Sequence, residues 1–406
     1  MTVTVCIPAY RAGRFLAETL NSVVNQTYSD LRVEIGVDPA DADGTGAPED
    51  TLAALTPFLS DPRFRVRRNP TRLGWDGNIR ALLERVETPY YAILPHDDIW
   101  DPRYLEILLS ILGQKALASV AYGDLFMFGV ADPWRHAVQL PGAGSVREQL
   151  LAFMLQGAEA MPWRGVTRSA LLPSIGGFPT DGHRGFAVEC EYALALILAG
   201  PAVHLPRTLY YKRIHPPSVL SASRARVVLE PNRIGLEQAW RNHVDRMWRL
   251  LGRGLARLTH ESPDGVAMDR LIWAAFTAAM LRRCPGGVPF APEDAESARG
   301  LLTTLSAMDA AVANPVLSRL HLVLWRHATA LGDIEQSRAH AEAAVATNPT
   351  SSDACLALAA HLESRGRLLE ALDWVAQAER AFPGGAGLMA LRRKIYHRLG
   401  WSAQPN

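Results

Sequence analysis

The chain has 406 residues, which is long enough for two or three domains. An apolar share of 48% with 20% charged residues is typical of a well-packed soluble protein and excludes a mostly disordered chain. Because 42 basic residues balance 41 acidic ones, the charge gives no reason to expect nucleic acid or an anionic membrane as the main partner.

Residues 2–100 alternate between strand-like and helix-like segments. The strand signals lie at 2–10, 31–38, 63–69 and 89–98, and the helix signals lie at 13–27, 48–60 and 74–87. Strands that alternate with helices predict an α/β fold with a mostly parallel sheet covered by helices. Ligands bind such sheets beyond the carboxyl ends of the strands. Asp38 and the pair Asp97 and Asp98 follow two of these strands, so we expect them at one crevice.

Beyond residue 220 the sequence becomes helical, and two markers recur with a period of 34 residues. The proline marker falls at 315, 349 and 383, and the glycine marker falls at 332, 366 and 400. This period and the small residues around it resemble the tetratricopeptide repeat, a pair of antiparallel helices. We therefore expect an α/β domain over 1–220, a helical linker region over 221–284, and an all-α domain with tetratricopeptide-like repeats over 285–406.

The four cysteines, at positions 6, 190, 284 and 355, show no short-range spacing. This pattern favours free thiols in a reducing compartment over disulfides or a zinc site. The first residues read directly as a strand, without the basic and apolar regions of a signal peptide, and no apolar run is long enough to span a bilayer. We expect a cytoplasmic protein without a transmembrane segment.

The stretch PHDD, residues 95–98, places two adjacent carboxylates after a strand of apolar residues. An ordinary turn is one reading, because Asp side chains commonly bond local backbone amides. The other reading is a site for Mg²⁺ or Mn²⁺, since these cations prefer carboxylate oxygens and are usually held together with substrate phosphates. A diphosphate ligand is the expected companion of such a cation.

Four segments resemble, in order, the motifs of family 2 glycosyltransferases of the GT-A (Rossmann-like) fold. They are VTVCIPAY to PADADGT (3–45), RNPTRLGW to PHDDIW (68–100), SIGGF to ALALILAG (174–200) and LYYKRIHPPSVLS (209–221). The resemblance covers about 220 residues. It implies a catalytic domain that binds a nucleotide sugar, with a UDP-linked sugar as the expected donor, and moves the sugar to an acceptor hydroxyl.

The resemblance also implies roles for single residues. Pro8, Ala9 and Tyr10 match the segment that lines the nucleotide, and Asp38 matches the residue that contacts the base. Asp97 and Asp98 match the carboxylates at the ribose and the metal-bound diphosphate, and the sequence does not say which one is the ligand. His215 matches a histidine that completes the metal or diphosphate site in some relatives.

Glu191 falls at the position of the catalytic base, with Glu where relatives have Asp. Its alternative role is simpler: Glu191, like Glu189, lies at the start of a helix and would favour the helix dipole. His215 could likewise be an ordinary loop histidine.

Taken together, these motifs imply an inverting, metal-dependent glycosyltransferase that takes part in polysaccharide, glycoconjugate or protein glycosylation. Its acceptor would be a saccharide, a lipid-linked group or a peptide, and the C-terminal helices could bind a protein partner or form a homodimer. The rival hypothesis is a non-catalytic nucleotide-sensing scaffold whose tetratricopeptide-like helices bind a partner. Val37 and Pro95 support the rival, because relatives have Asp at both positions.

Overall fold

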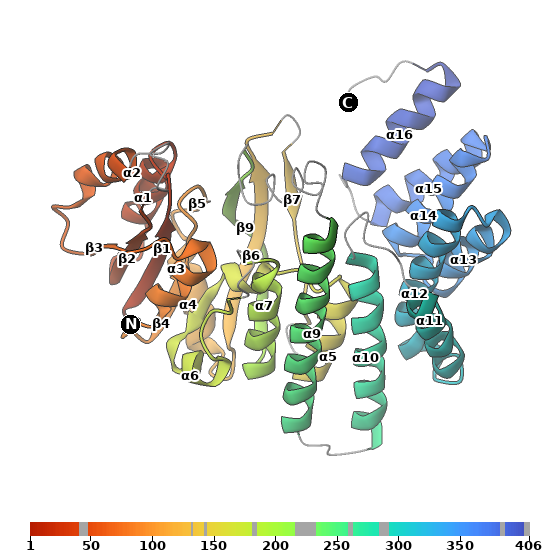
Figure 1. The fold of residues 1–406 in the computed structure, drawn as a ribbon, viewed down its shortest axis with the longest axis horizontal. Coiled ribbons are helices and arrows are strands. Elements are labelled where there is room, and N and C mark those ends of the chain that lie inside the picture. The colour runs from red at the N-terminus through yellow and green to blue at the C-terminus, as the bar shows by residue number, and fades with distance from the viewer. Residues whose placement is uncertain are drawn as a thin grey trace. The chain divides into compact units, whose positions relative to one another are not determined.

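A computed structural model of the chain (Figure 1) describes residues 1–39, 48–130, 133–141, 144–180, 185–215, 233–258, 263–283, 292–381 and 386–401. The chain divides into two compact units. The first comprises residues 1–153 and 158–259, and the second comprises residues 154–157 and 260–406.

The described strands of the first unit form one nine-stranded sheet in the order β3-β2-β1-β4-β8-β6-β9-β5, with β7 paired to β6. The first four strands in this order are parallel to one another. Their bounds are β1 Val3–Ala9, β2 Leu31–Val37, β3 Phe64–Arg68, β4 Tyr90–Ile93, β5 Ile99–Trp100, β6 Val120–Phe128, β7 Trp134–His136, β8 Val166–Arg168 and β9 Ala202–Arg213. This sheet confirms the predicted α/β architecture.

Every residue of β1 is buried, which explains why its sequence is apolar except for Thr4 instead of alternating between apolar and polar residues. Helices follow these strands as predicted. Up to residue 258 the described helices are α1 Leu16–Val24, α2 Pro48–Leu55, η1 Thr56–Phe58, α3 Gly74–Leu83, α4 Tyr104–Gln114, α5 Val146–Leu155, η2 Met161–Arg164, η3 Ser169–Leu171, α6 Leu172–Ile175, α7 Val188–Ala199 and α9 Arg233–Arg257. The predicted helix over 74–87 ends earlier, at Leu83.

Helix α9 packs against α7 within the first unit. The sequence analysis assigned this segment to a linker region over 221–284. In the structure the boundary between the two units instead falls near residue 259, while the predicted division into three domains stays a prediction.

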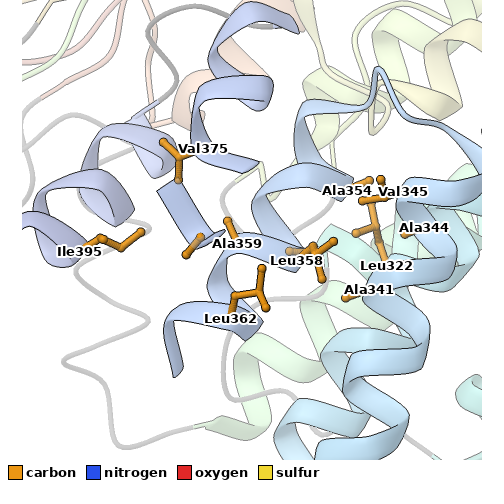
Figure 2. Packing of buried hydrophobic residues seen from close by; sticks show 12 residues of the cluster. Leu322, Ala341, Ala344, Val345, Ala354, Leu358, Ala359, Leu362, Val375 and Ile395 are labelled. Carbon is orange, nitrogen blue, oxygen red and sulfur yellow. The ribbon is translucent and has the colours of Figure 1, made fainter. Parts of the chain in front are cut away.

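The described part of the second unit after residue 262 is helical, in agreement with the predicted all-α region. Its helices are α10 Pro263–Arg283, α11 Pro292–Leu305, α12 Ala310–Leu331, α13 Ile334–Thr347, α14 Ser352–Ser364, α15 Leu368–Ala381 and α16 Ala386–Leu399. Neighbours in the sequence pack together, and Figure 2 shows their shared core of small and branched side chains. Ala341, Ala344 and Ala359 are fully buried in this core, so the recurring alanines allow the helices to approach closely.

The glycines of the 34-residue period have one conformation. Gly332, Gly366 and Gly400 have φ of 73°, 77° and 70°, and each follows the end of a helix. Left-handed residues end helices and are usually glycine. Of the proline markers, Pro315 lies inside α12, whereas Pro383 lies outside the described residues. The repeat identity of this helical region stays a prediction.

Among the described helices, none combines the length and apolar character that a membrane crossing requires. Cys6, Cys190 and Cys355 are buried free thiols, and Cys284 lies outside the described residues.

Two Gly→Ala substitutions in the helical unit should change the free energy of unfolding in opposite directions. Gly366→Ala should lower the free energy of unfolding by about 1 kcal/mol, because an alanine in this conformation is strained while nothing lies within 4 Å of its added methyl group. Gly300→Ala in α11, which also has nothing within 4 Å, should raise it by up to about 1 kcal/mol because alanine is a better helix former. Urea unfolding followed by circular dichroism measures both free energies of unfolding. If the two substitutions changed it in the same direction, the left-handed conformation of Gly366 would be contradicted.

Candidate active site

The parallel strands bring distant residues to one edge of the sheet. Val3 of β1 pairs with Leu31 of β2 and with Tyr90 of β4, so the three strands run in step. Beyond their carboxyl ends lie Tyr10, Asp38 and the loop that carries Asp97 and Asp98 (Figure 1). The fold therefore brings these residues to one edge of the sheet, as expected, while their role in nucleotide binding stays a prediction.

The loop after β4 is held in place from the side of α1. The hydroxyl of Thr19 lies 2.8 Å from the carbonyl oxygen of His96 and 2.9 Å from that of Asp98. The ring Nδ1 of His96 lies 3.1 Å from the carbonyl oxygen of Pro8. These contacts tie the loop to the end of β1, so the two carboxylates have fixed positions.

Asp98 points into the protein and is 2% exposed. Its Oδ2 accepts hydrogen bonds from Nη1 of Arg164 at 2.5 Å and from the Tyr210 hydroxyl at 2.7 Å. Its Oδ1 accepts from the backbone N–H of Arg213 at 2.9 Å. Burial raises the pKa of Asp98, and the charge of Arg164 acts against this shift. With three donors in place, Asp98 acts as a structural anion.

Asp97 points the other way, toward the crevice. Its Oδ2 lies 3.0 Å from Nε2 of His215, and the side chains of both residues keep 17–18% of their exposure. Burial acts to raise the pKa of Asp97, but the hydrogen bond from His215 and the nearby charges of His96 and Arg164 outweigh it and lower that pKa. Asp97 and His215 therefore offer one oxygen and one nitrogen donor at an accessible point.

Asp38 lies at the nucleotide end of the crevice and is 3% exposed. Its carboxylate accepts one hydrogen bond from the side chain of Asn69 at 2.8 Å and one from the backbone N–H of Gly74 at 2.9 Å. The guanidinium of Arg72 lies over the ring of Tyr10, 4.1 Å from its centroid. Each carboxylate oxygen of Asp38 keeps acceptor capacity, since a carboxylate oxygen accepts about two hydrogen bonds.

Glu191 occupies a different environment from the one predicted. It is 4% exposed, and its Oε1 lies 3.0 Å from Nδ1 of His243 and 3.0 Å from Nε of Arg246. Both partners come from α9. Because His243 and Arg246 already occupy this buried carboxylate, it is not placed to accept a proton from a substrate hydroxyl.

Glu189 lies one half-turn earlier in α7. Its Oε2 is buried and has no hydrogen-bond partner among the described residues. Glu189 also influences the pKa of Lys212 in β9, as do Asp97 and Asp98. Sequence reasoning named Glu189 only as an acid at a helix start, and it missed Lys212, Arg164 and the α9 residues that bind Glu191.

The comparisons with known proteins agree with this fold. Residues 4–163 match the model of the family Glycosyl transferase family 2, so the chain carries a domain of that family. Abequosyltransferase RfbV of Salmonella typhimurium is 33% identical over 119 residues, which cover 29% of this chain and 34% of RfbV. Glycosyltransferase GlyG of Streptococcus pneumoniae is 23% identical over 173 residues, which cover 43% of this chain and 55% of GlyG. The chain thus spans less than two thirds of these curated relatives.

Among solved structures, S. aureus TarS 1-349 in complex with UDP-GlcNAc superposes with a TM-score of 0.56 at 15% identity. The match covers 83% of this chain and 89% of that one. It confirms the predicted GT-A fold.

The environment of Asp98 predicts a large loss of stability on its removal. Asp98→Ala would leave the Arg164 guanidinium buried without its anion, and breaking such a pair costs about 3–5 kcal/mol. Thermal unfolding should show this loss, whereas Asp97→Ala, at an accessible point, should unfold close to the wild type. An Asp98→Ala variant as stable as Asp97→Ala would contradict the structural role.

Proposed function

We propose that this chain is an inverting glycosyltransferase that moves a sugar from a nucleotide-activated donor to an acceptor hydroxyl. The observation that carries this proposal is the convergence of two features on the crevice of a family 2 domain. These are the accessible pair of Asp97 and His215, and the partner-free Oε2 of Glu189.

The donor would lie across the carboxyl ends of the parallel strands. Pro8, Ala9 and Tyr10 would line the nucleotide, and Asp38 would accept a hydrogen bond from the base. TarS was solved with UDP-GlcNAc and with UDP, which supports a UDP-linked sugar as the donor here.

The residues at the crevice fit a divalent cation. Within the described residues, no group of three or more His, Cys, Asp or Glu side chains could hold a metal ion. Asp97 and His215 nevertheless supply two donors of the kind that Mn²⁺ accepts, and cations of this type are commonly completed by substrate phosphates. When bound, Mn²⁺ or Mg²⁺ would offset the charge of the leaving diphosphate. Asp98 would contribute indirectly, because its fixed position orients Asp97.

We assign the base to Glu189 in place of Glu191. Glu189 would accept the proton of the acceptor hydroxyl while that oxygen forms a bond to the anomeric carbon. The bond between this carbon and the diphosphate breaks, and the nucleoside diphosphate leaves with the electron pair. One displacement from the opposite side inverts the anomeric centre.

The acceptor would belong to a polysaccharide, a lipid-linked group or a peptide, and the reaction would take place in the cytoplasm. The C-terminal helices would bind a protein partner, an acceptor or a second copy of the chain. These assignments rest on the sequence motifs, the free thiols and the separate helical unit. A non-catalytic scaffold would bind a nucleotide but would not release one from a sugar donor. The turnover assays below therefore also distinguish the proposed enzyme from this rival hypothesis.

The cation site predicts a loss of metal-dependent binding. Asp97→Ala should weaken the Mn²⁺-dependent binding of UDP by about 10- to 100-fold or more, because a donor atom is removed. Isothermal titration calorimetry with and without Mn²⁺ measures this change. Asp101→Asn is the matched control, since its amide can keep the bond from the Arg103 backbone N–H. Equal affinity in Asp97→Ala and the control would rule out Asp97 as a ligand.

The two acids of α7 predict opposite phenotypes. Glu189→Gln should fold normally and bind UDP, but its turnover should fall by about 10²- to 10⁴-fold because the base is lost. Glu191→Gln should unfold at a lower temperature, because Arg246 and His243 lose the charge of their partner. Release of UDP from UDP-sugars and thermal unfolding report the two effects. A stable Glu191→Gln variant without turnover would restore Glu191 as the base.

A further inference from the structure

Lysine is rare in this chain, which has only three among its 42 basic residues. Lys115 is exposed after α4, and Lys394 forms an ion pair with Glu363 at 2.8 Å in the second unit. Lys212 differs from both. It is half-buried in β9, and no hydrogen bond or ion pair joins it to another described residue.

The register of β9 places Lys212 beside the crevice. Side chains alternate along a strand, so Lys212 shares a face with Tyr210, whose hydroxyl donates to Asp98. The following residue, Arg213, donates its backbone N–H to Asp98 and its Nε–H to the carbonyl oxygen of Asp97. Lys212 is therefore held at a fixed distance from the loop that carries both carboxylates.

The charged groups that act on Lys212 come from four elements. Arg164 of η2 repels it, while Asp98 and Asp97 from the loop and Glu189 from α7 attract it. His136 of β7 lies close enough for the charge of Lys212 to lower its pKa. Asp98 already has three donors and Asp97 has His215, so Glu189 is the carboxylate left with a buried atom that lacks a partner.

Lys212 and Glu189 nevertheless do not touch, because their charged atoms are more than 4.0 Å apart. The charge of Glu189 still acts on Lys212, and charges in a partly buried site are costly when their hydrogen-bonding atoms lack a partner. A bound hydroxyl or water satisfies both, since it can donate to a carboxylate and accept from an ammonium.

We propose that Lys212 is a substrate-binding residue of the acceptor site: its ammonium donates a hydrogen bond to an oxygen of the acceptor beside the hydroxyl that Glu189 deprotonates. This inference rests on the proposed function. The acceptor proton goes to Glu189, and Lys212 keeps its own proton throughout. In the slow hydrolysis of the donor, water molecules take the places of the reacting hydroxyl and of the neighbouring acceptor oxygen.

A lysine suits this position better than the arginine used elsewhere in the chain. Its compact ammonium carries three donors that rotate on a flexible stem, whereas a guanidinium has a rigid planar fork. Burial and, next to it, the charge of Arg164 lower the pKa of Lys212 to about 8. Because the contact needs the protonated form, turnover should fall as the pH rises through about 8.

The scarcity of lysine permits a direct test of the geometry. The full chain labelled with ¹³C at the lysine ε-carbon should give three resonances, and Lys212→Met identifies one of them by its absence. The Lys212 signal should titrate near pH 8, and Glu189→Gln should move this titration to lower pH because an attracting charge is lost. A Lys212 titration that is unchanged in Glu189→Gln would overturn the proposed arrangement.

Kinetics test the role in turnover. The probe is the member of a panel of UDP-, GDP- and dTDP-sugars that the wild type hydrolyses fastest with Mn²⁺, and the readout is nucleotide release. Lys212→Met should lower kcat about 10- to 100-fold, the value of one hydrogen bond to a charged group, with the KM for the donor unchanged. The decline of the rate above pH 8 should also disappear. Lys115→Met is the matched control and should behave as the wild type.

The outcomes separate the two proposals. A Lys212→Met variant with wild-type kcat and pH profile overturns the inference about Lys212, while Glu189→Gln without turnover would still support the proposed function. A wild type that neither hydrolyses any donor of the panel nor binds UDP with Mn²⁺ overturns the proposed function and the inference that rests on it. Thermal unfolding of Lys212→Met excludes misfolding as the cause of a low rate.

Discussion

The crevice depends on the buried ion pair between Asp98 and Arg164. Three parts of the first unit meet at this carboxylate: the loop after β4, η2, and the end of β9 through Tyr210 and the backbone of Arg213. An uncompensated charge at this depth would be strongly destabilising, so the three segments keep one arrangement. That arrangement fixes the loop that carries Asp97 and the segment around Arg213, which holds Lys212 one residue before it and His215 two residues after it.

The sequence was sufficient to predict the four parallel strands β1 to β4 and the helices between them, because apolar periodicity determines these features. It could not tell Asp97 from Asp98. Adjacent residues are chemically alike, and their roles were decided by Arg164, Tyr210 and Arg213, which lie 66, 112 and 115 residues further along the chain. No local pattern around Arg164 marks it as the partner of an acid, so this contact was visible only in the folded structure.

The sequence also could not distinguish the environments of the two acids of α7. Glu189 and Glu191 are two positions apart on a helix, so their side chains diverge by about 200°. Glu191 faces α9, where His243 and Arg246 bind it, and the sequence analysis had placed α9 outside the catalytic domain. The partners of Glu191 thus lie beyond the segment that carries the motifs, where no local pattern points to them. Resemblance in a motif identified the helix correctly, while the environment distinguished the two carboxylates.

The charged groups of the crevice thus fall into two sets with different chemistry. Asp98, Arg164, Glu191 and Arg246 satisfy one another and leave no room for a ligand, as expected of charges that stabilise a fold. Glu189 and Lys212 differ, because Oε2 of Glu189 has no hydrogen-bond partner and Lys212 has no hydrogen bond or ion pair among the described residues, while Asp97 and His215 keep part of their exposure beside them. Unsatisfied polar groups cost stability, and they persist where a substrate or ion completes them. The second set therefore marks the part of the crevice where donor, cation and acceptor would meet, and the first set explains why these groups stay open there.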